Sequence, residues 1–248
     1  MSKCLIVTGG GRGIGAEVSR KAAKQGYSVC VNFHRDQTSA QKLVRELEEE
    51  GANALAYQAD VSQEEEVEAL FQTVEKHLGT PEALVNNAGI LDLQTRVDGM
   101  NAERIQRIFA VNVTGSFLCA REAVKRMSTK YGGKGGSIVN LSSGAAKYGS
   151  PGEYVDYAAS KAAIDTLTIG LAREVAEEGI RVNAVRPGFI DTEIHQSGGE
   201  PDRMERVRPL VPMKRVGQAE EVADAIMWLL SDKASYTTGT ILDVSGGR

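Results

Sequence analysis

Several features that would indicate a membrane, secreted or nucleic-acid-binding protein are absent from this 248-residue sequence. No apolar run approaches the ~20 residues that a bilayer-spanning helix needs, and the first residues show no signal-peptide pattern. Basic residues are not in excess, because 29 Lys and Arg face 33 Asp and Glu for a net charge of −4. A surface dedicated to nucleic acid or anionic lipid would need a basic face. We therefore expect neither a nucleic-acid nor a membrane partner.

Cysteine is also scarce. Cys4, Cys30 and Cys119 are scattered along the chain, leave one residue over in any pairing and show no metal-ligand spacing. Neither a disulfide framework nor a metal site is therefore expected. Such cysteine usage is typical of a reducing compartment, and we expect a cytoplasmic protein.

The chain contains an alternation of short apolar runs and longer amphipathic stretches, without repeats, low-complexity tracts or linker-like segments. Apolar residues make up 42% of the sequence, which is enough for a core of ordinary size. The pattern predicts strands at 4–7, 29–33, up to 59, 83–85, 137–141, 180–185 and 240–244, and helices ending near 25 and over 39–50, 64–78, 102–127, 155–178 and 220–230. Such βαβ units predict a single Rossmann-like α/β domain, a doubly wound parallel seven-stranded sheet with helices on both faces.

A glycine-rich turn follows the first strand and opens the first helix. Glycines at this position let the backbone approach a pyrophosphate, whose charge then faces the helix N-terminus. A Walker-type phosphate loop is excluded, because no Gly-Lys-Ser/Thr follows. A plain glycine-rich turn is the alternative, and Gly11, Gly13 and Ala16 fit the dinucleotide fingerprint in a second register. The predicted cofactor contacts in the turn are Thr8, Gly9, Gly11, Arg12, Gly13, Ile14 and Gly15.

The end of the second strand bears on the choice of cofactor. Many NAD sites place an acid there to bind the adenine ribose, but the corresponding residues are Phe33, His34 and Arg35. Asp36 lies beyond this position and is interpreted as a turn residue or helix cap. Arg12, His34 and Arg35 could surround a 2′-phosphate, so NADP(H) is favoured over NAD(H), with a solvated loop charge as the alternative for Arg35.

Tyr157 and Lys161 have the i, i+4 spacing that places two side chains on one helix face, about 6 Å apart along the axis. A free phenol has a pKa near ~10, and a neighbouring ammonium, helped by a cationic nicotinamide ring, favours the phenolate. Tyr157 could then exchange a proton with an alcohol or carbonyl oxygen while hydride moves at the adjacent carbon. Ser142 and Ser143 end the fifth strand, at the sheet edge where ligands bind in such folds.

Taken in chain order, these motifs resemble the short-chain dehydrogenase/reductase family over essentially the whole chain. The resemblance implies that Ser143 orients the substrate oxygen, Tyr157 is the acid/base, Lys161 binds ribose and lowers the Tyr157 pKa, and Asn112 holds a relay water. It also implies a homotetramer, with the last helix and strand at one interface. Further cofactor contacts implied by the matching motifs are Asp60, Val61, Asn87, Ala88, Gly89, Pro187, Gly188, Ile190 and Thr192.

One departure from the family pattern concerns the serine. The interval between serine and tyrosine is about one residue longer than is common, which leaves Ser142 and Ser143 open, with Ser143 preferred as the more distal. Tyr154 is a second candidate phenol, but position 158 is Ala rather than Lys. An irregular segment at about 189–217 predicts a substrate lid, in which His195 is interpreted as a solvated side chain.

The sequence thus predicts an NADP(H)-dependent oxidoreductase that interconverts a small-molecule carbonyl and a secondary alcohol. A 3-oxoacyl carrier-protein reductase and a sugar dehydrogenase of the glucose type are alternatives within this class. Glu177 and Glu178 disfavour the former, because basic residues would be expected there to meet an acidic carrier. A catalytically silent dinucleotide-binding regulator is the alternative from another class, disfavoured by the complete set of Asn112, Ser143, Tyr157 and Lys161.

Overall fold

The computed structural model describes residues 3–192, 200 and 203–248. Seven parallel strands form one sheet in the order β3-β2-β1-β4-β5-β6-β9, as the strand pattern predicts. Their bounds are β1 (Cys4–Val7), β2 (Ser28–Phe33), β3 (Ala54–Gln58), β4 (Pro81–Asn86), β5 (Gly136–Leu141), β6 (Ile180–Pro187) and β9 (Ile241–Val244).

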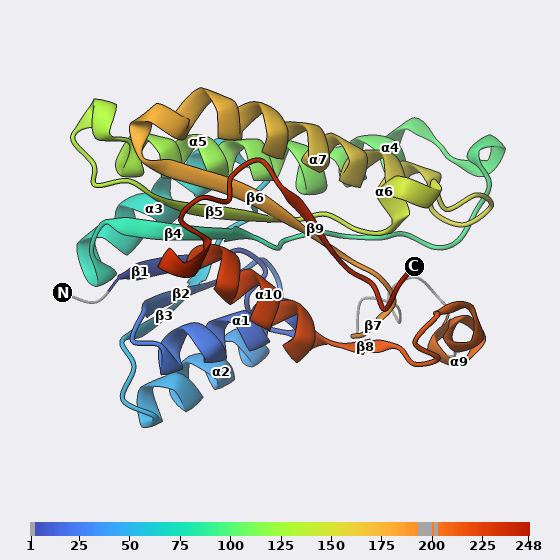
Figure 1. Ribbon diagram of the computed structural model, residues 1–248, viewed down its shortest axis with the longest axis horizontal. Helices are drawn as coiled ribbons and strands as arrows, with labels where there is room; N and C mark the ends of the chain where they lie inside the picture. The colour runs from blue at the N-terminus through green and yellow to red at the C-terminus, as the bar shows by residue number, and fades with distance from the viewer. Residues whose placement is uncertain (1–2, 193–199, 201–202) are drawn as a thin grey trace.

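Helices cover both faces of the sheet (Figure 1). One face carries α1 (Gly13–Lys24), α2 (Gln37–Glu49) and α10 (Ala219–Leu230), and the other carries α3 (Glu64–Leu78), α4 (Ala102–Phe109), α5 (Gly115–Met127) and α7 (Val155–Val175). Shorter helical segments are α6 (Ala145–Tyr148), α9 (Arg203–Val207), η1 (Val97–Gly99), the π-helical η2 (Ala110–Thr114), η3 (Thr129–Tyr131), η4 (Ala176–Glu178), η5 (Arg208–Leu210) and η6 (Asp232–Ala234).

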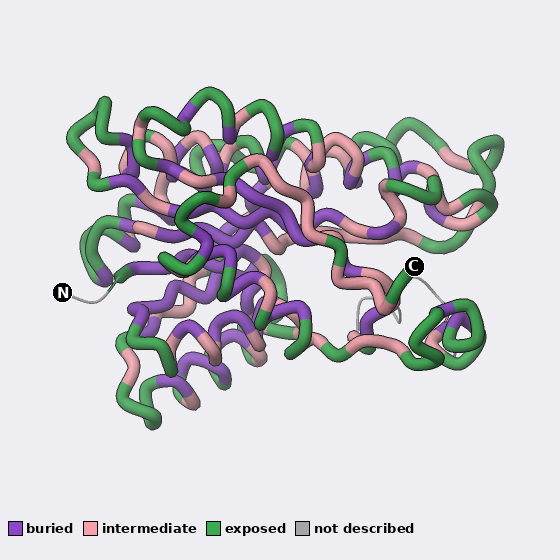
Figure 2. The backbone as a smooth tube through the Cα atoms, viewed as in Figure 1, coloured by how far each residue is buried: buried purple, intermediate pink, exposed green. Residues whose placement is uncertain are grey.

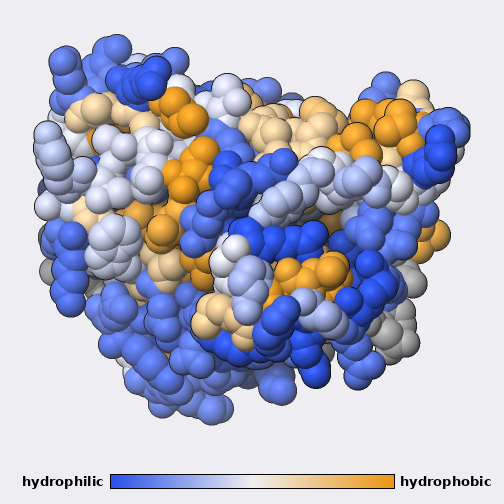
Figure 3. Space-filling view, turned by 45° about the vertical axis from the view of Figure 1, so that its right-hand side comes forward, coloured by the Kyte–Doolittle hydropathy of each residue, from blue (hydrophilic) through white to orange (hydrophobic). Residues whose placement is uncertain are grey.

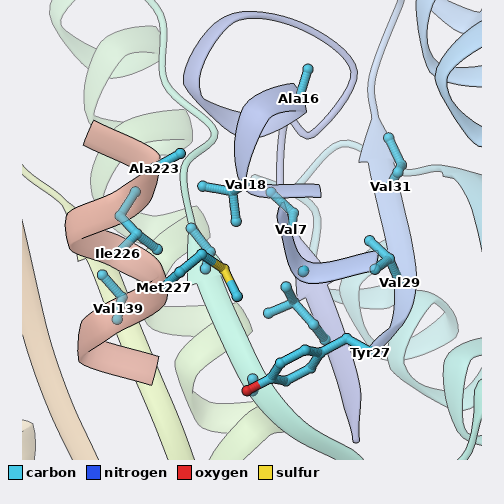
Figure 4. Close-up of a cluster of buried hydrophobic side chains, with 14 of the residues drawn as sticks. Val7, Ala16, Val18, Tyr27, Val29, Val31, Val139, Ala223, Ile226 and Met227 are labelled. Atoms are coloured by element: carbon cyan, nitrogen blue, oxygen red, sulfur yellow. The ribbon is translucent and has the colours of Figure 1, made fainter. Parts of the chain in front are cut away.

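Each face of the sheet has its own hydrophobic cluster, because successive side chains of a strand point to opposite faces. On the α1–α2–α10 side, Val7 and Val139 of the sheet pack with Val18 of α1 and with Ile226 and Met227 of α10 (Figure 4). On the other side, Ile6, Leu84 and Ile138 pack against α3, α5 and α7. Figure 2 shows the result, a sheet whose central strands are buried on both faces. The edge strands β3 and β9 are partly exposed. Within the described residues, no helix is long and apolar enough to cross a membrane.

Two predictions of local structure need correction. The helix predicted over 102–127 is divided, because the π-helical turn η2 separates α4 from α5. Such turns insert one residue into a helix and are frequent at functional sites. The segment 189–217 is not wholly irregular, since β7 (Ile190–Asp191) and β8 (Gly217–Gln218) pair as parallel strands and α9 lies between them. In Figure 1 these elements lie at the edge of the sheet where β6 and β9 end.

Candidate active site

The glycine-rich turn packs too closely against its surroundings to accept side chains. Gly9 and Gly13 have φ values of +59° and +52°, in the left-handed region that favours glycine. A Cβ on Gly15 would lie 2.6 Å from the Asn87 Nδ2 atom and 2.7 Å from the Gly9 carbonyl oxygen. A side chain at Gly15 would therefore displace its neighbours, and a side chain at Gly9 or Gly13 would strain the backbone.

Thr8 and Asn87 join this turn to the end of β4. The Asn87 side chain donates to the carbonyl oxygens of Thr8 and Gly9 at 2.8 and 2.9 Å. The backbone N–H groups of Asn87 and Ala88 both donate to the Thr8 hydroxyl at 3.0 Å. The predicted cofactor residues Thr8, Gly9, Asn87 and Ala88 are thus brought together as one hydrogen-bonded unit.

The N-terminus of α1 has the chemistry of an anion site. Arg12 at the N-cap position of α1 does not cap the helix through its side chain, and the first turn contains no acidic residue. The first N–H groups of a helix have no partner within the helix and carry partial positive charge. Ile14 lines the main cavity, and a Cβ on Gly13 would lie 3.6 Å from the side chain of Thr192. A phosphate group fits this donor set.

At the end of β2 the structure shows a residue that the sequence analysis missed. Asn32 is buried, accepts from the Gly9 N–H at 3.3 Å and donates to the Ala59 carbonyl at 3.1 Å. Its side chain thereby links β1, β2 and the segment after β3. An asparagine inside an otherwise apolar buried strand was the available signal, since a polar group there must be hydrogen-bonded.

The predicted 2′-phosphate residues Arg12, His34 and Arg35 are all exposed. Asp36 caps α2, because its carboxylate accepts from the Ser39 N–H at 3.0 Å, as predicted. That hydrogen bond, helped by the Arg12 charge, lowers the pKa of Asp36. The His34 Nε2 atom lies 3.7 Å from the carboxylate of Asp60, so these two predicted cofactor residues contact each other.

The Asp60 carboxylate is also occupied locally, because it accepts from the backbone N–H and the hydroxyl of Ser62 at 2.9 and 2.7 Å. Val61 is buried against Gly115, where a Cβ would lie 2.7 Å from a Val61 methyl group. Asp60 and Val61, which follow shortly after β3, are therefore held in place before any ligand is added.

The two serines after β5 have different environments. Ser142 is buried and donates to the Lys161 carbonyl at 3.3 Å. Ser143 is half-buried, accepts from the Ala145 N–H at 3.1 Å and acts to lower the pKa of the Tyr157 phenol. Both line the main cavity, but the geometry favours Ser143 as the partner of the phenol.

Burial controls the protonation of Tyr157. It raises the pKa of the phenol, and the Ser143 hydrogen bond and the Arg203 charge only partly oppose it. This direction is opposite to the lowered value expected from the sequence, because the loss of hydration outweighs nearby dipoles and charges in the chain alone. The phenol is therefore protonated at neutral pH.

Lys161 lies close to this phenol. Its Nζ atom is 5.7 Å from the centroid of the Tyr157 ring and donates to the Leu141 carbonyl at 2.6 Å. Burial lowers the pKa of Lys161 to about 8, opposed by Asp165. The ammonium form is still the main one at neutral pH, so a cation is positioned beneath the cavity.

Asn112 lies in the π-helical turn η2 and is fully buried. Its side chain accepts from the Ile90 N–H at 2.8 Å and donates to the Ile90 carbonyl and the Ser160 hydroxyl, both at 3.1 Å. Gly89 lies beside this amide, since a Cβ on Gly89 would be 3.6 Å from the Asn112 Oδ1 atom and 3.4 Å from the Lys161 Nζ atom. The amide therefore ties the segment after β4 to α7, the helix that carries Tyr157 and Lys161.

Ser143, Tyr157 and Lys161 line a cavity of about 350 Å³. One part is formed by Ile14, Asn87, Gly89, Pro187, Gly188, Ile190 and Thr192, and another by Leu91, Tyr148, Tyr154, Phe189, Arg203 and Arg248. Tyr154, the second candidate phenol, lines the cavity with its ring buried beneath Arg203 at 5.0 Å. His195 and part of the predicted lid lie outside the described residues.

Arg203 and Arg248 were not predicted from the sequence. Each is distant from the other motifs along the chain, and an isolated arginine in a charged segment carries no recognisable signal. Figure 3 shows a face of the molecule on which strongly hydrophilic and hydrophobic side chains lie next to one another. Two cations beside aromatic rings become evident only after folding.

The fold, the glycine turn and the Ser143–Tyr157–Lys161 cluster define a nicotinamide-dependent oxidoreductase of the Rossmann type. A family model described as enoyl-(acyl carrier protein) reductase matches residues 9–248. The chain belongs to the short-chain dehydrogenase/reductase family, whose members bind nicotinamide cofactors.

Among curated proteins, the chain is 58% identical to the uncharacterized oxidoreductase YgfF of Escherichia coli strain K12, covering 98% of each chain. It is 42% identical to 3beta-hydroxysteroid dehydrogenase 1 of Eggerthella lenta, covering 99% of this chain and 93% of that one. It is 38% identical to glucose 1-dehydrogenase 2 of Bacillus subtilis strain 168, covering 99% and 94%. The names of these relatives include a steroid and a sugar, so substrates differ widely at similar overall identity.

Proposed function

We propose that the protein is an NADP(H)-dependent oxidoreductase that interconverts a carbonyl and a secondary alcohol. The observation that carries the proposal is the cluster of Ser143, Tyr157 and Lys161 at the wall of one cavity, next to the glycine turn. A half-buried phenol, a hydroxyl that lines the same cavity and a nearby ammonium are the groups that proton exchange with an alkoxide oxygen needs. When bound, the nicotinamide cofactor supplies or accepts the hydride at the neighbouring carbon.

The protonated state of Tyr157 favours carbonyl reduction as the first step to test. The phenol gives its proton to the carbonyl oxygen as negative charge develops there, and the Ser143 hydroxyl donates a hydrogen bond to the same oxygen. In the opposite direction the phenolate accepts the alcohol proton. The ammonium of Lys161 stabilises the phenolate that remains after proton donation. Its Nζ atom lies 5.7 Å from the centroid of the Tyr157 ring, and a nearby opposite charge favours the charged form of the phenol.

Asn112 supports the reaction by position. Its hydrogen bonds to Ile90 and Ser160 keep the α7 residues at a constant distance from the segment after β4. The implied relay water would bind near the Asn112 backbone carbonyl, which also accepts from the Ser116 hydroxyl at 3.0 Å. We propose this residue as a positioning group rather than a reacting one.

The residues that would hold the cofactor follow from the anion site. The backbone around Gly13 and Ile14 would bind the pyrophosphate, and Asn87, Gly89 and the segment from Pro187 to Thr192 would contact the nicotinamide half. The preference for NADP(H) is supported by Arg12, His34 and Arg35 around the end of β2 and by the use of Asp36 as a helix cap. A 2′-phosphate would be attracted to such a cationic edge, although Asp60 lies beside His34.

Two further parts of the proposal concern the substrate lid and the oligomeric state. We propose that the segment 189–217 covers bound substrate, supported by the position of α9 and Arg203 at the cavity wall. We also propose a homotetramer with α10 and β9 at one interface. Trp228 on α10 is among the exposed large apolar side chains, at 41%, and would supply apolar surface to such an interface.

The experiment is an assay of NADPH and NADH oxidation with a panel of ketones and aldehydes. Reduction with a preference for NADPH is expected, and replacing Arg35 by Asp should shift the preference towards NADH by about tenfold, since it replaces attraction by repulsion at the 2′-phosphate. Oxidation of neither cofactor with any carbonyl would contradict the activity. An unchanged cofactor ratio in Arg35→Asp would contradict the role of Arg35 alone.

A further inference from the structure

Two guanidinium groups lie in the part of the cavity wall formed by aromatic side chains. Arg203 extends from α9 and lies 5.8 Å from the centroid of the Phe189 ring. Arg248 lies 4.6 Å from the same ring and 5.2 Å from the ring of Tyr148. The Phe189 ring is therefore close to both cations, which concentrates positive charge at one place on the wall.

Both guanidinium groups have unused hydrogen-bonding capacity. Arg203 is 7% exposed and pairs with Glu153 at 2.7 Å and Glu200 at 3.4 Å, but its Nε atom is buried without an acceptor among the described residues. The Nη1 atom of Arg248 is also buried without an acceptor in the described part of the chain. Buried donors are nearly always paired in native proteins. A missing acceptor at this wall therefore indicates a ligand.

The charge of the wall indicates which kind of ligand. Among the described side chains that line the cavity, the cations are Lys161, Arg203 and Arg248, and the single carboxylate is that of Glu153. Glu153 is already engaged by Arg203 and, at 3.0 Å, by Arg206. Positive charge is thus in excess, and Arg248 has no ion pair with an acidic side chain of the described residues.

We propose, on the basis of the proposed function, that the substrate carries an oxyanion of the carboxylate type, which Arg248 binds with support from Arg203 while the carbonyl lies at Tyr157. A guanidinium presents parallel N–H groups that match the two oxygens of a carboxylate. Leu91, Tyr148 and Phe189 also line the cavity, which fits an apolar spacer.

The test uses straight-chain methyl ketones that end in a carboxylate two, three or four methylene groups from the carbonyl, and the carboxamide of each. Acid and amide have nearly the same shape, so their difference in affinity reports the charge. Each is titrated calorimetrically into the wild-type protein, with saturating NADP⁺ and without it. Arg248→Gln and Arg203→Gln are compared with Arg208→Gln, which removes an exposed cation outside the cavity wall.

At one or more chain lengths the wild-type protein should bind the acid at least about tenfold more tightly than the amide. This ratio should fall to within about twofold in Arg248→Gln, fall less in Arg203→Gln and remain unchanged in Arg208→Gln. Retention of the far-ultraviolet circular dichroism spectrum and of NADP⁺ binding would show that the variants are folded.

The inference is overturned if no acid is preferred over its amide at any chain length. It is also overturned if Arg248→Gln weakens NADP⁺ binding and leaves the ratio unchanged, because Arg248 would then contact the cofactor phosphates. An acid preference in a protein that binds no NADP⁺ would support the anion site and contradict the proposed function, so the two failures are distinguishable.

Discussion

The two parts of the cavity wall are built in different ways. Behind the proposed catalytic residues, Asn86 donates to Asn140 at 2.9 Å and Asn140 donates to Thr168 at 2.9 Å, and all three are buried. On the substrate side, α9 is attached by the buried Arg203 and also through charges at the surface, where Arg206 pairs with Glu153 and Glu200 and has 49% of its side chain exposed. Buried hydrogen bonds are costly to break, whereas exposed ion pairs contribute little.

This difference suggests a division of labour. The part with the buried network holds Ser143, Tyr157 and Lys161 at constant distances, which proton transfer requires. The part attached by exposed charges can change in sequence and position without loss of the fold. Relatives whose names include a sugar and a steroid, at 38 and 42% identity, agree with such an arrangement.

The largest expected effect is on catalysis. Tyr157→Phe removes only the exchangeable proton and should lower kcat by a factor of about 10²–10⁴, with the cofactor Kd almost unchanged. Tyr154→Phe is the matched control, because that phenol lies three residues earlier on the same cavity wall, and it should retain most of the activity. Steady-state kinetics on a ketone substrate measure both, and equal losses would contradict the assignment.

The second effect concerns the buried ammonium. The pKa of Lys161 is about 8 in the folded chain and near ~10.4 when unfolded, so between these values the unfolded chain binds more protons. Folding stability contributed by this group therefore rises with pH across that window. The stability of the wild type relative to Lys161→Met should increase by on the order of 3 kcal/mol between pH 7.5 and pH 10.5. Urea unfolding over this range measures it, and a flat difference would contradict the buried position.

The buried amide chain behind the site provides the third test. Asn140→Ala removes one of two hydrogen-bond partners from the amide of Asn86, which still donates to the Ser116 carbonyl. It also removes one from the hydroxyl of Thr168, which still donates to the Ile164 carbonyl. We expect a loss of about 2 kcal/mol in the free energy of unfolding. Equilibrium denaturation measures this loss, and a change below about 0.5 kcal/mol would mean that the network is not what stabilises this side.

The smallest effect is expected on the substrate side. Arg206→Gln breaks the ion pairs of Arg206 with Glu153 and Glu200 and leaves those of Arg203 in place, so stability should change by less than about 1 kcal/mol. The same denaturation experiment, run beside Asn140→Ala, compares the two parts of the wall directly. A larger loss of unfolding free energy for Arg206→Gln than for Asn140→Ala would contradict the proposed difference between the two parts of the wall.

Sequence periodicity was sufficient for the parallel seven-stranded sheet and for most helix limits, because apolar runs and glycine stops are local features. It did not predict the π-helical turn around Asn112, since the apolar spacing continues through the region without interruption. Burial raises the pKa of Tyr157 in the chain alone, whereas the lowered value predicted from the sequence also depends on a bound cationic nicotinamide. Arg203 and Arg248 were missed because their roles arise from contacts between distant segments.

The most direct test of the central claim is a calorimetric titration of the purified protein with NADPH and, separately, with NADH. It requires no knowledge of the substrate and addresses the glycine turn and the cationic end of β2 together. The account predicts tight binding of NADPH and at least about tenfold weaker binding of NADH. Binding of neither cofactor would contradict it.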